Sequence, residues 1–266
     1  MKKLFISADI EGTCGIVDWQ ETEVGNAYSD YFRNQMTAEV AAVCRGALKA
    51  GFDEIVIKDA HDSARNLYPD KLPKEVKIIR SWSRDPFSMM TGIDESFDAV
   101  IFTGYHNAAG TGSNPLSHTM TGNIYSYKIN GLTTSEFLMN SYIAEYFGVP
   151  VAMLTGDKGL CLAAKEHISG LTTVPVSEGR GNCSLSIHPQ KACELMEEAA
   201  EKALNGDLKD CHITLPKEFE VEVAFKRHQS AYRASFYPGA YQIDANTVGF
   251  KCKDYMDFLK FEMFAV

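Results

Sequence analysis

The chain has 266 residues, of which 45% are hydrophobic, and a formal net charge of −9 at pH 7. This composition indicates a folded protein with a large core, at a length where chains begin to divide into lobes. The acidic balance argues against a nucleic-acid-binding protein, because such a surface requires clustered basic side chains.

The start of the chain and the cysteines indicate a compartment. The first apolar run is interrupted by Asp9 and Glu11 after about six residues, which is too short for a signal peptide. No stretch approaches the roughly 20 apolar residues of a membrane span. The seven cysteines include no Cys-x-x-Cys pair, unlike a disulfide framework or a thiolate zinc site. We therefore expect a cytoplasmic protein that does not bind membranes.

Strand and helix patterns alternate along the chain. Apolar runs predict strands at 3–8, 54–59, 76–80, 99–104, 123–130, 150–155 and 219–226. Helical spacing predicts helices at 28–50, 136–147, 160–168, 189–204 and 254–264. This order predicts an α/β fold, with a mostly parallel sheet covered by helices on both faces. We expect this catalytic unit to span residues 1–170 and a smaller C-terminal α+β lobe to span 171–266.

Local signals support several of these boundaries. Gly51 follows the helix predicted at 28–50, where a C-terminal cap belongs. The pair Asn130-Gly131 is typical of a hairpin turn, and Thr134 or Ser135 precedes the next helix as its cap.

Carboxylates and histidines follow three of the predicted strands. Asp9 and Glu11 follow the first strand, His61 the second and His106 the fourth. Ligands bind beyond the carboxyl ends of strands in open α/β sheets, so we expect these side chains to meet. Two close carboxylates repel unless a proton or a cation compensates them, and two nearby histidines favour the cation. Imidazole and carboxylate ligands suit zinc better than manganese or iron.

Each of these residues also has an ordinary structural interpretation. An Asp after a strand often caps a loop, and Glu136 suits the first turn of a helix by charge alone. His118 follows the flexible stretch 110–114 and is either a surface histidine or a general acid-base beside the metals. The metal hypothesis therefore depends on finding several such carboxylates and histidines at one edge of the same sheet.

These positions resemble peptidase family M55, the D-aminopeptidases. The resemblance covers essentially the whole chain, and five motifs occur in order at similar spacing. The motifs are Ser7-Ala8-Asp9-Ile10-Glu11-Gly12, Asp59-Ala60-His61, Gly104-Tyr105-His106, Ser117-His118-Thr119-Met120, and Glu136 with Asn140.

The resemblance implies two zinc ions per subunit and a role for each candidate residue. Asp9 would bridge the two ions, and His118 would be the catalytic nucleophile or base. Glu11 and His61 would complete the shell of one ion, while His106 and Glu136 would complete the other. The resemblance also implies a homodecamer of paired pentameric rings that encloses the active sites and admits short peptides.

We therefore expect a zinc-dependent aminopeptidase that releases N-terminal amino acids, of D configuration in the family, from short peptides or amino-acid amides. The loops at 13–30 and 177–187 diverge from the family and are expected to line the substrate pocket. The stretch Gly110-x-Gly112-x-x-Pro115 lacks a third glycine and does not follow the first strand, so it is not a dinucleotide-binding loop.

Two alternatives remain open from the sequence. One is another dinuclear metal hydrolase, such as a phosphoesterase, which would place basic residues around a phosphate; only Lys58 and Arg65 lie close to the motifs. The other is a non-catalytic Mg²⁺-binding regulatory module, with Asp9, Glu11 and Asp59 as an acidic pocket.

Overall fold

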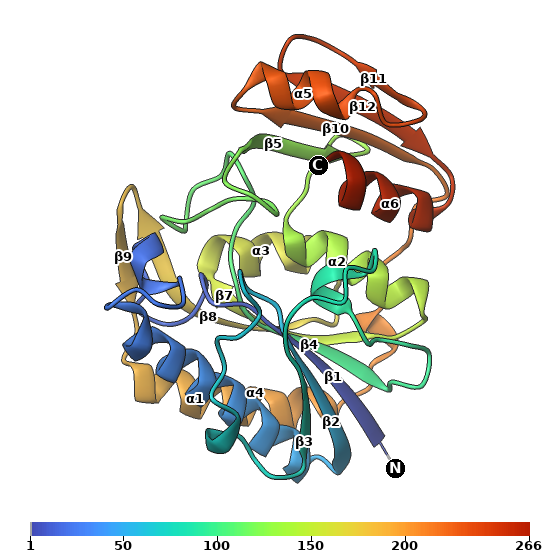
Figure 1. Ribbon diagram of the computed structural model, residues 1–266. Helices are drawn as coiled ribbons and strands as arrows, with labels where there is room; N and C mark the ends of the chain where they lie inside the picture. The colour runs from blue at the N-terminus through green and yellow to red at the C-terminus, as the bar shows by residue number, and fades with distance from the viewer. Residues whose placement is uncertain (1) are drawn as a thin grey trace.

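The computed structural model describes residues 2–266 and contains two β-sheets stacked through helices (Figure 1). The first sheet has seven strands in the order β3-β2-β1-β4-β7-β8-β9, and only the β8–β9 pair is antiparallel. Its strands are β1 Lys2–Ala8, β2 Phe52–Asp59, β3 Val76–Ile79, β4 Ala99–Tyr105, β7 Val151–Asp157, β8 Thr172–Arg180 and β9 Cys183–Ser186.

The second sheet has five antiparallel strands in the order β11-β12-β10-β5-β6. They are β5 Ile124–Ile129, β6 Leu132–Thr133, β10 Phe219–Phe225, β11 Ala240–Gln242 and β12 Thr247–Cys252. Asn130 and Gly131 join β5 to β6 with φ angles of 52° and 77°, as a tight hairpin turn with two left-handed residues requires.

Helices cover both faces of the parallel sheet (Figure 1). One face carries α1 Ser29–Lys49 and α4 Pro189–Leu204, and the other carries α2 Glu136–Tyr146 and α3 Lys158–His167. The second sheet packs with α5 His228–Ala234 and α6 Tyr255–Ala265. Short 3₁₀ helices are η1 Trp19–Glu21, η2 Pro69–Lys71, η3 Ser88–Met90 and η4 Lys209–Cys211.

The strands alternate between two hydrophobic clusters because successive side chains of a strand point to opposite faces. Leu4 and Ile6 of β1 pack in the cluster under α1 and α4, whereas Phe5 packs in the cluster under α2. This second cluster continues into the antiparallel sheet. Tyr142 of α2 lies 6.4 Å from Phe219 of β10, between ring centroids. The two sheets therefore share one continuous core.

The predicted fold class is confirmed: a mostly parallel sheet with helices on both faces is joined to a smaller α+β lobe. The division expected at residue 170 does not coincide with the division between the sheets. β8 and β9 extend the parallel sheet, because Thr172–Arg180 pairs with β7. β5 and β6 belong to the second sheet, where β5 pairs with β10.

Helix caps follow the local signals. The Ser135 side chain accepts a hydrogen bond from the Leu138 N–H and begins α2, and Gly51 has a φ of +81° just beyond α1. Within residues 2–266, every helix is too short or too polar to cross a membrane.

Candidate active site

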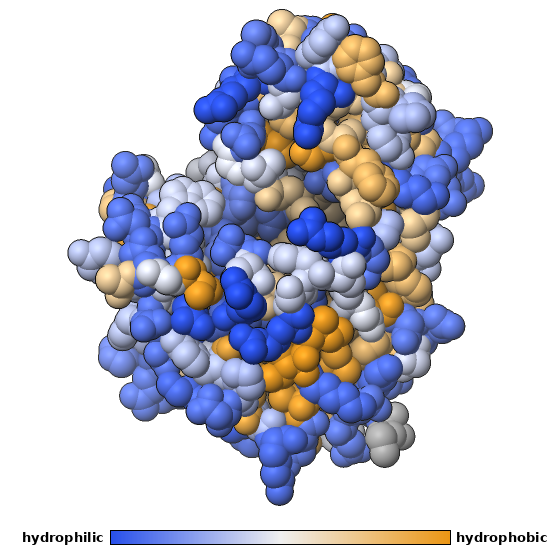
Figure 2. Space-filling view, viewed as in Figure 1, coloured by the Kyte–Doolittle hydropathy of each residue, from blue (hydrophilic) through white to orange (hydrophobic). Residues whose placement is uncertain are grey.

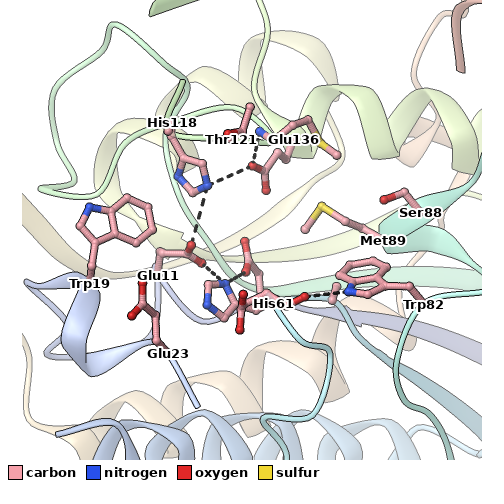
Figure 3. A pocket seen from close by; sticks show the side chains of 15 residues that line it. Glu11, Trp19, Glu23, His61, Trp82, Ser88, Met89, His118, Thr121 and Glu136 are labelled. Atoms are coloured by element: carbon pink, nitrogen blue, oxygen red, sulfur yellow. Dashed lines mark hydrogen bonds and ion pairs between the residues drawn. The ribbon is translucent and has the colours of Figure 1, made fainter. Parts of the chain in front are cut away.

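The six candidate side chains lie together at the carboxyl edge of the parallel sheet. Figure 3 shows four of them, Glu11, His61, His118 and Glu136. Three strands deliver four of them: Asp9 and Glu11 after β1, His61 after β2 and His106 after β4. Glu136 opens α2, and His118 lies in the loop between β4 and β5. All are buried except His118, which is half-buried.

Two glycines let the turns after β1 and β4 press against each other. The Gly12 N–H donates to the Gly104 carbonyl at 2.8 Å, and the Asp9 N–H donates to the Thr103 carbonyl at 2.9 Å. A Cβ on Gly12 would lie 1.9 Å from the Tyr105 carbonyl oxygen. Gly104 has a φ of +67°, which other residues rarely adopt, and its Cβ would lie 2.3 Å from the Asp9 carbonyl oxygen. These motif glycines therefore set how closely the turns that carry Asp9, Glu11 and His106 approach each other.

The side chains form two sets that share Asp9. In one set, His61 Nδ1 lies 2.9 Å from Glu11 Oε2 and 3.4 Å from Asp9 Oδ1. In the other, His106 Nε2 lies 3.5 Å from Asp9 Oδ2 and 3.4 Å from Glu136 Oε2. In each set the potential ligand atoms lie within 4.8 Å of one another. The two oxygens of Asp9 thus face two different histidines.

The hydrogen bonding of these groups fits bound metal ions. His106 Nδ1 lies 3.0 Å from the Asn107 carbonyl, which only a protonated Nδ1 can bond; in the neutral ring, Nε2 then carries a lone pair. That lone pair faces two carboxylates, an arrangement that repels unless a cation lies between them. Asp9 Oδ2 and His106 Nε2 are buried without a hydrogen-bond partner in the described chain.

Electrostatics lead to the same requirement for positive charge. Burial, reinforced by the charge of Glu11, raises the pKa of Asp9 well above its usual value. Burial by itself lowers the pKa of His61, but Glu11 and Asp9 raise it well above its usual value. The carboxylate of Glu136 raises the pKa of His106 in the same way against the effect of burial. The cluster therefore holds either protons or metal cations, and mixed imidazole and carboxylate ligands suit zinc.

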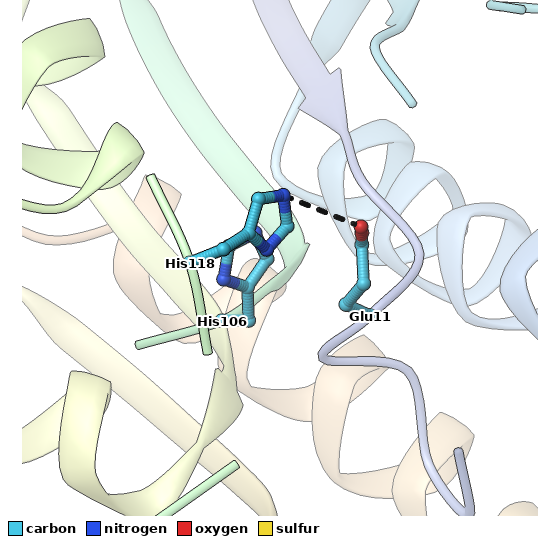
Figure 4. Close-up of side chains that lie close together, drawn as sticks. All are labelled: Glu11, His106 and His118. Carbon is cyan, nitrogen blue, oxygen red and sulfur yellow. Dashed lines mark ion pairs between the residues drawn. The ribbon is translucent and has the colours of Figure 1, made fainter. Parts of the chain in front are cut away.

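His118 stacks on His106 and points its Nε2 toward Glu11 (Figure 4). Its Nδ1 lies 2.9 Å from the Leu116 carbonyl, so the neutral ring directs its unprotonated Nε2 into the site. Nε2 lies 3.6 Å from Glu136 Oε1 and 3.8 Å from Glu11 Oε1. Burial and the charge of His106 lower the pKa of His118, and the two rings stack at 4.2 Å. A neutral imidazole in this position can accept a proton.

Asp59 holds the turn that carries His61. Its carboxylate accepts hydrogen bonds from the Asn66 N–H at 2.6 Å, the Leu67 N–H at 2.9 Å and the Asn66 side chain at 2.9 Å. The Asn66 amide also donates to the His61 carbonyl at 2.8 Å. Asp59 is therefore occupied within its own loop. Asn66 lies in no recognised motif, and only the tertiary structure reveals its part in this clamp.

A cavity of about 500 Å³ opens beside the cluster, in the hollow between the lobes (Figure 2). Both tryptophans of the chain line it, on opposite sides of His61 (Figure 3). Trp19 lies edge-on to His118 with ring centroids 5.1 Å apart. Trp82 donates from Nε1 to the Asp62 carbonyl at 2.7 Å. Sequence patterns alone did not single out either tryptophan.

The two divergent loops contribute differently to this cavity. The loop at 13–30 supplies Trp19 and Glu23 to its wall. The loop at 177–187 supplies no lining residue in the described chain. Lys58 lies behind the wall, where its Nζ contacts the Trp82 ring at 4.0 Å and donates to the carbonyls of Asp59 and Ser81.

Comparisons with known proteins identify the family of this chain. A model of peptidase family M55, described as D-aminopeptidase, matches residues 1–264. The D-aminopeptidase of Bacillus subtilis (strain 168) is 32% identical over 259 residues, covering 96% of this chain and 93% of that protein. A solved structure described as "Zn-dependent D-aminopeptidase DppA from Bacillus subtilis, a self-compartmentalizing protease" has a TM-score of 0.91 at 30% identity, covering 98% and 95% of the two chains. This chain therefore belongs to peptidase family M55, the D-aminopeptidases.

Proposed function

We propose that this chain, a metallo-aminopeptidase by family, binds two zinc ions and releases N-terminal amino acids from short peptides. The observation that carries the proposal is the position of Asp9, whose two oxygens face His61 and His106 separately. Such a carboxylate is suited to bridge two ions. Glu11 with His61 would complete one site, and His106 with Glu136 the other.

When bound, a zinc pair supplies Lewis acidity toward the scissile carbonyl and makes water a better nucleophile. The protein itself supplies the proton transfer. His118 Nε2 accepts the proton of the attacking water and returns it to the leaving amine, a contribution of about 10²–10⁴-fold. Glu23 and Asp62 on the cavity wall add negative charge that favours a substrate ammonium group.

The solved relative is described as a D-aminopeptidase, and we infer the same preference for this chain. The test is zinc content after purification without added metal, with hydrolysis of matched D- and L-alanine p-nitroanilides. About two zinc ions per chain with chelator-sensitive release from the D-substrate is the expected result. Activity on the L-substrate alone would overturn the stereochemistry. A metal-free protein without hydrolysis would overturn the function.

The two rival functions have less support. A phosphate site needs basic side chains, yet neither Lys58 nor Arg65 lines the cavity, and Lys58 is bonded behind Trp82. The regulatory module needs Asp59 as a free acidic ligand, and its carboxylate is taken by Asn66 and Leu67. Hydrolysis of a generic aryl phosphate, or binding of Mg²⁺ without zinc, would restore these rivals.

We also infer a ring-built homodecamer that encloses the active sites. The solved relative is described as self-compartmentalizing, and the second lobe exposes hydrophobic side chains (Figure 2). Phe236 is 70% exposed, Phe264 68% and Tyr232 59%. Large exposed apolar groups mark association surfaces. Light scattering tests the assembly, and a monomer at micromolar concentration would contradict it.

The cysteines support a proposal for the compartment. All seven are free of disulfides, which suits the reducing cytoplasm that we propose for this enzyme. Fractionation of cells that express the full chain tests this assignment, and recovery outside the cytoplasm would contradict it.

A further inference from the structure

A second cavity, of about 400 Å³, adjoins the catalytic one. The two share four lining residues: Trp82, Ser88, Met120 and Thr121. The second cavity extends away from the metal ligands, between the loop at 84–86 and the last turn of α6. Together the cavities make a continuous cleft, within the size range of small-ligand sites.

The two ends of this cleft differ in their charged side chains. The catalytic end holds the acidic cluster together with Glu23 and Asp62, and no lysine or arginine of residues 2–266 lines it. The second cavity holds one basic side chain, Arg84. Arg84 is exposed, and its guanidinium has no hydrogen-bond or ion-pair partner within the described chain.

The two acidic residues beside Arg84 are engaged elsewhere. The Asp85 carboxylate accepts from the Ser83 hydroxyl at 2.6 Å, the Phe87 N–H at 2.9 Å and the Thr91 hydroxyl at 3.1 Å. Glu262 accepts from the Tyr127 hydroxyl, and burial raises the pKa of Glu262 to about 7. Arg84 therefore remains available to an anion that enters the cleft.

We propose that the second cavity is the subsite for the C-terminal end of a short peptide, and that Arg84 pairs with the terminal carboxylate. The inference rests on the proposed aminopeptidase function. An unblocked short peptide carries an ammonium group at one end and a carboxylate at the other, and the cleft offers an acidic cluster at one end and the partner-free Arg84 at the other. The planar guanidinium can bind both oxygens of a carboxylate, whereas a lysine offers a point charge. Arg84 thus selects free short peptides over blocked or internal segments.

The test compares kcat/KM for an alanyl dipeptide and tripeptide, each as the free acid and as the C-terminal amide. The peptides carry the alanine stereoisomer that the wild-type enzyme hydrolyses. The variants are Arg84→Gln, Arg84→Lys and the matched control Arg80→Gln. Arg80 is exposed and lies outside both cavities, so its variant removes the same charge nearby without touching the cleft.

We expect wild type to prefer one of the free acids over its amide by about tenfold, the effect of a charge-assisted hydrogen bond. In Arg84→Gln this ratio falls toward one through a higher KM for the free acid. Arg84→Lys gives an intermediate ratio, and Arg80→Gln retains the wild-type ratio. An acid-to-amide ratio that is the same in wild type and Arg84→Gln for both lengths would overturn the subsite while leaving the aminopeptidase intact. If Arg80→Gln also loses the preference for the free acid, the preference depends on overall charge, and the subsite would be overturned. An absence of hydrolysis by wild type would instead reject the proposed function.

Discussion

The carboxyl edge of the parallel sheet and the interior of α1 both bury carboxyl groups, but only the edge surrounds them with histidines. At the edge, Asp9, Glu11 and Glu136 face His61 and His106. Within α1, Glu39 is buried with neutral partners. Its Oε1 accepts from the Cys14 N–H at 3.1 Å and the Gln35 amide at 2.9 Å, and its Oε2 has no partner in the described chain.

The difference shows two ways to compensate a buried acid. Burial raises the pKa of Glu39 to about 7, because a proton is the only compensation that its surroundings allow. The histidines instead lower the pKa of Glu11 well below its usual value against the effect of burial. The acids at the edge face imidazole nitrogens with which they can share a cation, whereas Glu39 faces only hydrogen-bond donors. Burial alone therefore does not identify a metal site.

The largest effect is expected from replacing Asp9, the residue that both candidate ligand sets share. Asp9→Ala removes the carboxylate that faces both histidines, so both zinc ions should be lost and hydrolysis should fall to background. Elemental analysis and peptide hydrolysis measure the two outcomes. Asp62→Ala is the control, because Asp62 lines the same cavity and belongs to neither ligand set, so it should keep its zinc. Full zinc retention by Asp9→Ala would refute the bridging role.

The next effect separates proton transfer from metal binding at the same edge. His118→Ala should keep both zinc ions and lose about 10²–10⁴-fold in kcat, because only the proton acceptor is removed. Zinc analysis alongside single-turnover kinetics checks this expectation. Near-normal turnover by the variant would remove His118 from the mechanism, and loss of zinc would make it a ligand.

A smaller effect tests the support of the ligand turn. Asp59→Ala leaves the buried Asn66 and Leu67 N–H groups without acceptors, at a cost of about 1–3 kcal/mol each in the free energy of unfolding. Because His61 sits on this turn, zinc affinity should fall about 10–100-fold, measured by chelator competition. Asp59→Asn keeps one acceptor oxygen, so its zinc affinity should lie between those of wild type and Asp59→Ala. An unchanged zinc affinity in Asp59→Ala would show that His61 is held without the clamp.

The last prediction concerns stability and not activity, at Glu39. The folded chain binds a proton at Glu39 that the unfolded chain, at a usual pKa of 4.5, releases at lower pH. Its contribution to stability therefore falls as pH rises from about 4.5 to about 7, by about 3 kcal/mol in total. Glu39→Gln lacks this dependence, so its stability relative to wild type should rise across that window. The nearby titratable groups are Cys14 and Cys193, and burial raises the pKa of both thiols.

Denaturant unfolding of both proteins at several pH values measures the difference. Glu197→Gln is the matched control with the opposite sign. The Glu197 carboxylate lies 2.7 Å from both Lys49 Nζ and Arg45 Nε. Lys49, and to a smaller extent Arg45, lower the pKa of Glu197. Ionised Glu197 therefore stabilises the fold above its usual pKa, and this stabilisation is lost as pH falls. A pH-independent difference between Glu39→Gln and wild type would mean that Glu39 is ionised in the fold.

Much of the site could be predicted because its ligands end strands. A parallel sheet brings its carboxyl ends to one edge, so Asp9, Glu11, His61 and His106 could be placed together from the strand pattern. Glu136 and His118 lie on either side of the β5–β6 hairpin, and only the resemblance to the family linked them to that edge. The structure brings all six together. The zinc ions and the roles of the ligands remain predictions.

Other features depended on contacts between distant segments. The hairpin at Asn130-Gly131 could be predicted because its turn is local, but its pairing with β10 joins residues about 90 positions apart. Trp19 and Trp82 face the cavity because two loops meet there, and neither loop has a periodic pattern. Arg84 has a partner-free guanidinium only because Asp85 and Glu262 bond elsewhere.

The sequence by itself determined the fold class, the helix caps and the residues at the carboxyl edge, because these depend on local periodicity and on the geometry of a parallel sheet. The tertiary structure alone decided which lobe each strand joined, which buried acids face histidines, and how the cleft continues from the candidate zinc ligands to Arg84. Those outcomes depend on packing between segments far apart in the chain, and local patterns do not encode which distant surfaces will meet.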